Sequence, residues 1–138
     1  MATDSSSLAR RWFEEVWNQR RAETIDELLT AESVCYADDG AVRGPEDFKQ
    51  RLYQPLSAAF PDLQLRVDDV IAEGDQAVVR WRADGTHTGD GLGFPATGET
   101  AAFRGLTWVR VCDGCLVEAW QSSNIPEILQ TLAQKAVA

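Results

Sequence analysis

GTHTGDGLGFPATGE, residues 85–99, holds five of the chain's ten glycines and its only histidine, His87. A phosphate-binding loop of this composition would follow a strand and open onto a helix N-terminus, whose backbone amides hold the phosphate. The residues after Gly98 instead have the pattern of a second strand. We therefore interpret the stretch as a connection between two antiparallel strands, in which glycines supply positive φ angles and Pro95 supplies a fixed bend.

Strand patterns lie on both sides of this connection. In the strand before it, alternate side chains share a face, so Trp81 and His87 are expected together on the apolar face. The odd-numbered residues from Leu63 to Ile71 are expected on one face of the preceding strand for the same reason. Four long strands are predicted, over residues 63–71, 76–88, 101–112 and 116–124.

Helical spacing of apolar residues precedes and follows the strands. It predicts a first helix behind the serines at 5–7, which can cap its start, and a short second helix at the capping box Thr24–Glu27. Proline suits the first helical position, so a third helix is expected from Gly44-Pro45, and a last helix follows from Ile125. This order predicts one α+β domain over residues 1–138, a cone in which a curved antiparallel sheet wraps the N-terminal helices around an internal pocket.

Aromatic residues supply candidate walls for this pocket. Phe60, Trp81 and Trp120 are expected where the sheet meets the helices, because a sheet face that is covered by helices carries large apolar side chains. The alternative is that they fill the core and leave no space.

The charge balance argues against a nucleic-acid partner. The chain has 22 acidic and 13 basic residues and a net charge of -9, which repels a phosphate backbone. The sequence shows neither a secretory leader nor an apolar segment of membrane-spanning length, so we expect a soluble cytoplasmic protein with no membrane partner.

The three cysteines do not indicate a disulfide framework or a metal site. Cys112 and Cys115 form a C-x-x-C, but their spacer Asp113-Gly114 separates two strand patterns, which is typical of a hairpin turn. A zinc site would need further ligands, of which the chain offers only one histidine and one other cysteine, Cys35, so the hairpin turn is the better interpretation. We expect no metal.

Several segments together carry a resemblance to a known family. They are FEEVWNQR (13–20), RGPEDFKQ (43–50), AFPDL (59–63), IAEGDQAVVRW (71–81), GTHTGDGLGFPATGET (85–100) and DGCLVEAW (113–120). In their order and spacing they resemble the SnoaL-like polyketide cyclases, a family of the nuclear-transport-factor-2-like superfamily of cone-shaped α+β domains. The resemblance implies a small hydrophobic or polyketide-like ligand, no cofactor, and a homodimer.

The resemblance also implies an aldol ring closure, for which this chain lacks the usual base. The family's aspartate base lies four residues after the tryptophan of the last strand, where this chain has Asn124. Its histidine, fourteen residues upstream, corresponds to Arg110. An amide cannot remove a carbon-bound proton, although Asn124 could donate hydrogen bonds to a carbonyl or enolate oxygen. Alternatively, Asn124 caps the last helix, with Glu127 three residues later.

Two ionisable residues could replace the missing base. Alternation along the last strand puts Glu118 on the same face as Trp120 and Asn124, and burial there would raise the pKa of its carboxyl. Glu118 could equally form an ion pair with an arginine. His87 could act as a pocket acid or base, or as a neutral ring that is hydrogen-bonded at a strand end.

The register of the last hairpin decides which residues face Trp120. A two-residue loop at Asp113-Gly114 would put Thr107 and Val109 beside Trp120. A three-residue loop with Gly114 in the left-handed region would bring Trp108 and Arg110 there instead. We favour the three-residue loop, because the family's histidine must face its aspartate.

The sequence therefore predicts a small-molecule pocket protein, with three possible roles. It could be a diverged cofactor-free cyclase or isomerase, a related hydroxylase or epoxide hydrolase, or a binder without catalysis. The candidate catalytic residues are Asn124, His87 and Glu118, and the candidate ligand-binding residues are Arg110, Trp81, Trp120, Trp108 and Phe60.

Overall fold

Six strands form one curved, open sheet in the computed structural model, which describes residues 4–136. The spatial order is β2-β1-β6-β5-β4-β3. Every neighbouring pair is antiparallel except β1 and β6, which run parallel. The strands are β1 (Val34–Ala37), β2 (Gly40–Arg43), β3 (Gln64–Glu73), β4 (Gln76–Thr86), β5 (Thr100–Cys112) and β6 (Cys115–Ser123).

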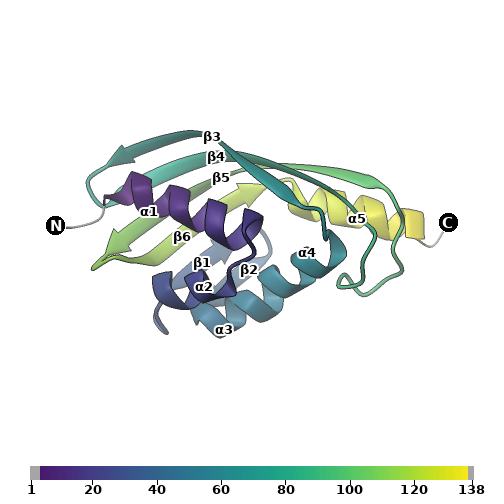
Figure 1. The fold of residues 1–138 in the computed structure, drawn as a ribbon, viewed down its shortest axis with the longest axis horizontal. Helices are drawn as coiled ribbons and strands as arrows, with labels where there is room; N and C mark the ends of the chain where they lie inside the picture. The colour runs from purple at the N-terminus through teal and green to yellow at the C-terminus, as the bar shows by residue number, and fades with distance from the viewer. Residues whose placement is uncertain (1–3, 137–138) are drawn as a thin grey trace.

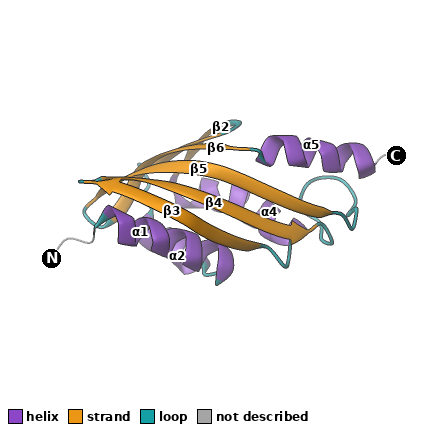
Figure 2. Ribbon diagram, turned by 90° about the horizontal axis from the view of Figure 1, so that it is seen from above, coloured by secondary structure: helices purple, strands orange, loops and turns teal. Residues whose placement is uncertain are grey.

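The helices that precede β3 in sequence lie on the concave side of the sheet (Figures 1 and 2). This arrangement confirms the predicted α+β cone. The helices are α1 (Ser5–Trp12), which continues as the π-helical turn η1 (Phe13–Asn18), α2 (Ala22–Leu28), and α3 (Gly44–Phe48), which continues through the π-helical turn η2 (Lys49–Tyr53) into α4 (Gln54–Ala59). The last helix, α5 (Ile125–Ala136), lies at the end of the sheet (Figure 1).

Two predicted helix starts are wrong in detail. The carboxylate of Asp4, rather than one of the serines, caps α1 by accepting a hydrogen bond from the Ser7 N–H at 2.7 Å. Helix α2 begins two residues before the predicted capping box, so Thr24 lies inside the helix, where its hydroxyl donates to Glu15 at 2.7 Å. Helix α1 thus has a different side-chain cap from the expected one, and α2 begins after Arg21 without a side-chain cap.

A β-bulge in β3 changes which residues face the core. Strands β3 and β4 pair regularly up to Val67, and pairing resumes at Asp69. The extra residue reverses the alternation, so Leu65 is buried whereas Ile71 is exposed. The prediction that Ile71 shares the face of Leu63 and Leu65 is therefore wrong.

The last hairpin combines both of the predicted registers. Cys112 pairs with Cys115 across a two-residue turn in which Asp113 and Gly114 both have positive φ, so the predicted three-residue loop is wrong. A bulge after Leu116 then shifts the pairing, because Val111 pairs with Leu116 but Arg110 pairs with Glu118. The shift brings Trp108 opposite Trp120, as was expected from the longer loop.

The glycine-rich connection packs against helix α4. His87 and Glu99 continue the β4–β5 pairing beyond the strands, with the His87 N–H donating to the Glu99 carbonyl at 2.9 Å. The Gly89 N–H donates to the Ala59 carbonyl at 3.1 Å, and a Cβ on Gly91 would lie 2.6 Å from the Pro55 carbonyl oxygen. The connection therefore lies against α4, and no helix follows it to form a phosphate site.

Candidate functional site

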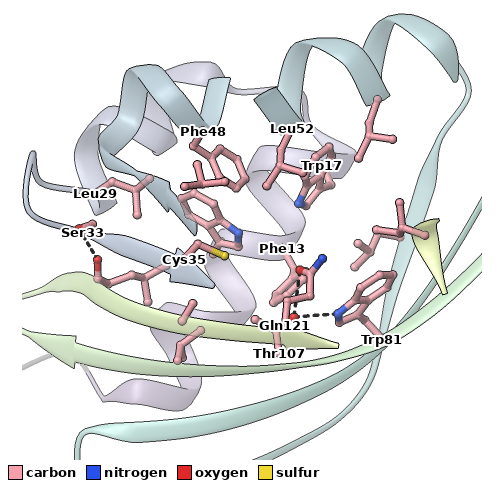
Figure 3. Close-up of a pocket in the computed structure, with 18 of the residues that line it drawn as sticks. Phe13, Trp17, Leu29, Ser33, Cys35, Phe48, Leu52, Trp81, Thr107 and Gln121 are labelled. Atoms are coloured by element: carbon pink, nitrogen blue, oxygen red, sulfur yellow. Dashed lines mark hydrogen bonds between the residues drawn. The ribbon is translucent and has the colours of Figure 1, made fainter. Parts of the chain in front are cut away.

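An apolar cavity lies between the concave face of the sheet and the helices (Figure 3). The space open to the centre of a water molecule measures about 90 Å³, which exceeds what one water needs. Most of its lining is aromatic or aliphatic, from η1, α1 and the α3–α4 run on one side and the strands on the other. The lining includes Trp12, Phe13, Trp17, Phe48, Leu52, Leu56, Leu63, Leu65, Trp81 and Phe103.

Three polar side chains form a hydrogen-bonded chain along the sheet side of the cavity. The indole Nε1 of Trp81 donates to Thr107 Oγ1 at 3.0 Å, and Thr107 Oγ1 donates to Gln121 Oε1 at 3.4 Å. These residues come from the adjacent strands β4, β5 and β6. Figure 3 shows the chain, with the amide nitrogen of Gln121 turned away from Thr107.

Gly105 allows the Trp81 ring to reach Thr107. Trp81 pairs with Gly105 across β4 and β5, and its indole lies over the space that a Cβ would occupy. A Cβ at position 105 would lie 2.5 Å from Cζ2 of the ring. Glycine at this position therefore keeps the indole against β5.

Thr107 and Gln121 face each other across β5 and β6. They are fourteen residues apart, the spacing that the resemblance implies for the histidine and aspartate of the cyclases. Arg110 and Asn124 have the same spacing but are not opposite each other, because Arg110 pairs with Glu118. Gln121 is not among the predicted site residues, because the bulge after Leu116 reverses the alternation of side chains along β6.

Three of the candidate ligand residues, Arg110, Trp108 and Trp120, lie on the outer face of the sheet. Arg110 and Glu118 form an ion pair at 2.9 Å, which is the alternative role considered for Glu118. The Arg110 guanidinium lies 5.9 Å from the centre of the Trp120 ring, and Trp108 packs on Trp120 with 5.4 Å between ring centres. Trp108 is 46% exposed. The expectation that Trp120, Trp108 and Arg110 line the pocket is therefore wrong.

Asn124 bonds to the backbone of β5 instead of facing the cavity. Its Oδ1 accepts from the Arg104 N–H at 2.8 Å, and its Nδ2 donates to the Ala102 carbonyl at 3.3 Å. The side chain that accepts from the first amide of α5, that of Ile125, is Ser123 at 3.1 Å. Asn124 thus extends the β5–β6 pairing past the end of β6, a role that neither prediction for it included.

His87 is fully buried at the end of β4, outside the cavity lining. Its Nδ1 accepts from the Thr97 N–H at 3.2 Å and lies 3.0 Å from Thr97 Oγ1. The ring packs on Phe60 and Phe94, with 5.6 and 5.5 Å between ring centres. Phe60, expected as a pocket wall, is a fully buried core residue here. Of the predicted site residues, Trp81 lines the cavity with its side chain, and Glu118 belongs to the lining residues although its carboxylate is paired with Arg110 on the outer face.

The lining contains little that can titrate. Within residues 4–136, the lining includes two ionisable residues, Cys35 and Glu118, and the carboxylate of Glu118 is paired with Arg110 on the outer face of the sheet. Burial, with a smaller effect of the nearby Asp38 carboxylate, raises the pKa of the Cys35 thiol to about 11. A second hydroxyl, that of Ser33, donates to the Leu116 carbonyl at 2.6 Å. The same described residues contain no cluster of His, Cys, Asp and Glu that could hold a metal ion.

Comparison with known proteins identifies the family. The profile of the family described as SnoaL-like polyketide cyclase matches residues 7–132. The chain belongs to this family. Among residues 4–136, no helix of this SnoaL-like protein is long and apolar enough to cross a membrane. No curated protein matches it significantly.

Solved structures agree with this assignment. A candidate SnoaL-like polyketide cyclase from Jannaschia sp. CCS1 superposes with a TM-score of 0.81 at 24% identity, over 94% of this chain and 91% of that one. AclR, a candidate hydroxylase from Streptomyces galilaeus, superposes with a TM-score of 0.80 at 28% identity, over 94% of this chain and 81% of AclR. IdmH, a candidate polyketide cyclase from Streptomyces antibioticus, superposes with a TM-score of 0.78 at 28% identity, over 95% of this chain and 99% of IdmH. A protein from Burkholderia pseudomallei described as nuclear-transport-factor-2-like shares this fold, with a TM-score of 0.75 at 14% identity over 95% of this chain and 98% of that one.

Proposed function

We propose that this SnoaL-like protein binds a small, largely apolar molecule of the polyketide type in the cavity and holds it beside Gln121. The observation that supports this role is an aromatic-lined space with one short polar chain, Trp81–Thr107–Gln121, at its side. Binding sites for small molecules have this composition, in which apolar walls supply affinity and a few polar groups fix orientation.

We infer that the protein does not carry out the base-catalysed aldol step. That step needs a group that removes a carbon-bound proton, and Gln121 and Thr107 cannot do so at neutral pH. The carboxylate of Glu118 is bonded to Arg110, and the Cys35 thiol, with its raised pKa, stays protonated. None of these four groups has a free lone pair that is basic enough to remove the proton and begin the reaction.

A second candidate function is an enzyme that polarises a carbonyl without abstracting a proton. The amide of Gln121 can donate to an oxygen that gains negative charge, as side-chain amides do in oxyanion sites. Because the chain is similar to a candidate hydroxylase and to candidate cyclases, this second proposal includes a diverged cyclase, isomerase or hydroxylase. Turnover that Gln121→Leu abolishes would favour it over binding alone.

Titration with a small aromatic hydrocarbon tests the binding proposal. α-Methylstyrene fits the chemistry of the walls, and its binding is followed by backbone amide shifts in nitrogen-labelled protein. We expect the shifts to centre on cavity residues and to be lost in Ala119→Phe, which fills the cavity from β6. Leu106→Phe, on the outer face of β5, is the matched control and should bind normally. Shifts that survive Ala119→Phe would contradict the proposal.

We propose further that the protein is a homodimer that forms through the outer face of its sheet. Tyr36 stacks on Trp120 with 5.8 Å between ring centres, and Trp108 also packs against Trp120. Leu106 lies next to them and is half exposed. A second copy that presents the same aromatic patch would cover it, since symmetric dimers use one self-complementary surface.

A reducing compartment suits the cysteines, and we propose a cytoplasmic location on this ground. Cys35, Cys112 and Cys115 are free thiols. Cys112 and Cys115 pair directly across the hairpin, where an oxidising compartment would expose them to disulfide exchange. We also propose that binding needs neither metal nor cofactor, because apolar walls and one amide are sufficient for a small neutral ligand.

A further inference from the structure

The polar chain of the cavity has a fixed direction, which begins at Trp81. An indole Nε1–H can only donate a hydrogen bond, and the Trp81 side chain is almost fully buried. Its partner at 3.0 Å, Thr107 Oγ1, must therefore act as the acceptor. Thr107 is buried as well, so its single hydroxyl proton needs a partner other than the indole.

The hydroxyl of Thr107 in turn fixes the orientation of the Gln121 amide. The acceptor for its proton is Gln121 Oε1 at 3.4 Å. An amide that accepts through its oxygen directs its nitrogen the other way, and Figure 3 shows the Gln121 nitrogen on the side away from Thr107. The two N–H groups of Gln121 Nε2 are therefore left for the cavity.

The remaining polar side chains of the lining do not offer the cavity a free hydrogen-bond acceptor. Ser33 Oγ accepts from the Thr30 N–H at 2.9 Å and donates to the Leu116 carbonyl at 2.6 Å. The carboxylate of Glu118 accepts from Arg110 at 2.9 Å on the outer face of the sheet, and the thiol of Cys35 is a weak donor while it is protonated. Figure 3 shows Trp17, whose indole nitrogen can only donate, facing the same space.

We propose that Gln121 Nε2 binds the acceptor oxygen of a carbonyl compound, such as an aryl ketone or quinone, whose apolar part fills the aromatic cavity. Trp81 and Thr107 are positioning residues, which act by holding the amide oxygen away from the ligand. This assignment rests on the proposed binding function and adds that the ligand carries a hydrogen-bond acceptor. A ligand whose polar group can only donate, such as an ammonium, has no partner at this position.

Two ligands of nearly equal shape separate the hydrogen bond from the apolar fit. Acetophenone carries a carbonyl oxygen where α-methylstyrene carries a methylene group. Both are titrated into nitrogen-labelled protein, and dissociation constants come from the amide shifts. The variants are Gln121→Met, which keeps length and volume but removes the donors, and Thr107→Val, which keeps shape but removes the hydroxyl.

We expect Gln121→Met to weaken acetophenone binding about tenfold and to change α-methylstyrene binding less than about twofold, since a buried carbonyl without its donor is costly. Thr107→Val should weaken acetophenone by a smaller factor, because the freed amide can rotate. In the wild type the Nε2 protons of Gln121 should shift downfield with acetophenone and stay in place with α-methylstyrene.

The outcomes separate the two proposals. Failure of both ligands to bind would overturn the binding function itself. Equal losses for the two ligands in Gln121→Met, or unmoved Gln121 side-chain protons, would leave an apolar binding cavity and overturn the carbonyl assignment. A Thr107→Val variant with full acetophenone preference would overturn the positioning role. Thermal unfolding of each variant shows whether it is folded at the temperature of the titration.

Discussion

Asn124 and Gln121 carry the same carboxamide group in different surroundings. Asn124 exchanges hydrogen bonds with Ala102 and Arg104 of β5, which fixes the end of β6. Gln121 has its oxygen on Thr107 and its nitrogen toward the cavity. The difference comes from position along one strand, because residues three apart lie on opposite faces. A site residue therefore cannot be chosen by its type alone.

Asp62 makes stability depend on pH at the start of the sheet. Its carboxylate accepts from the Thr86 backbone N–H at 2.7 Å and from the Thr86 hydroxyl at 2.9 Å, which lowers the pKa of Asp62 below 3.8. A lowered pKa means that the stabilisation is present above the unfolded value of about 3.9 and is lost as the pH falls through the native value. Asp62→Ala should reduce the urea midpoint at pH near 7.

The same variant should differ less from the wild type in acid. As the pH falls below about 3.8, the wild type loses the contribution of the ionised carboxylate and the two urea midpoints should converge. Glu32→Ala, at an exposed acid for which no ion pair is found among the described residues, serves as the control. A constant difference between Asp62→Ala and wild type from neutral pH to below pH 3 would contradict this account.

The Cys35 thiol should react slowly in the native protein. Burial raises its pKa from 9.0 to about 11, so at any pH below both values the thiolate fraction is about a hundredfold smaller. We expect iodoacetamide at pH 8 to modify the exposed Cys112 first, as peptide mass mapping over time would show. The Cys35 rate should rise as the pH increases toward 11 and fall when acetophenone fills the cavity. Equal rates for Cys35 and Cys112 would contradict burial in the cavity.

At the scale of elements, two β-bulges decide which faces line the cavity. One shifts β3 at Asp68, and the other shifts β6 after Leu116. The alternation of residues in sequence predicts that these strands exist and almost where they end. It cannot predict an inserted residue, because a bulge depends on pairing with a distant strand. Strand β4 has no such break in its pairing with β5, and its predicted face, with Trp81 and His87, is confirmed.

The glycine-rich connection should depend on Gly89 for its contact with α4. A Cβ at Gly89 would collide with the carbonyl oxygen of Ala58, which belongs to the helix backbone and cannot move aside alone. Gly89→Ala should therefore detach the connection and lower the urea midpoint. Gly93→Ala is the control, since its Cβ meets nothing within 4 Å and the substitution carries only the cost of positive φ, about 1 kcal/mol.

Limited proteolysis locates this effect. Cleavage between residues 88 and 98 should be faster in Gly89→Ala than in Gly93→Ala, with intact strands on both sides. A Gly89→Ala variant as stable and as resistant as Gly93→Ala would show that the connection does not need its close contact with α4.

At the scale of the whole molecule, the curved sheet has two faces with different roles. The concave face and the helices enclose the cavity, whereas the outer face exposes Tyr36, Leu106 and Trp108. The order of helices and strands was enough to predict the cone and its pocket. The sequence did not predict which tryptophans lie inside, because Trp108 and Trp120 are as apolar as Trp12, Trp17 and Trp81.

The outer patch should hold two copies together. We expect sedimentation equilibrium to give a dimer for the wild type and a monomer for Leu106→Lys, which places a charge in the patch. Ile71→Lys adds the same charge at a position that is 71% exposed on the edge strand β3 and should remain a dimer. A monomeric wild type, or dimers in all three proteins, would contradict this interface.

We propose that Gln121 occupies the position of the family's base and cannot act as one. Exchange of the methyl protons of acetophenone for deuterium is the first step of an aldol reaction, and proton NMR in D₂O follows it directly. We predict no acceleration by the wild type or by Asn124→Asp, and an acceleration on the order of 10²-fold or more by Gln121→Asp, which supplies a positioned base. Exchange accelerated by the wild type, or by Asn124→Asp and not by Gln121→Asp, would contradict the claim.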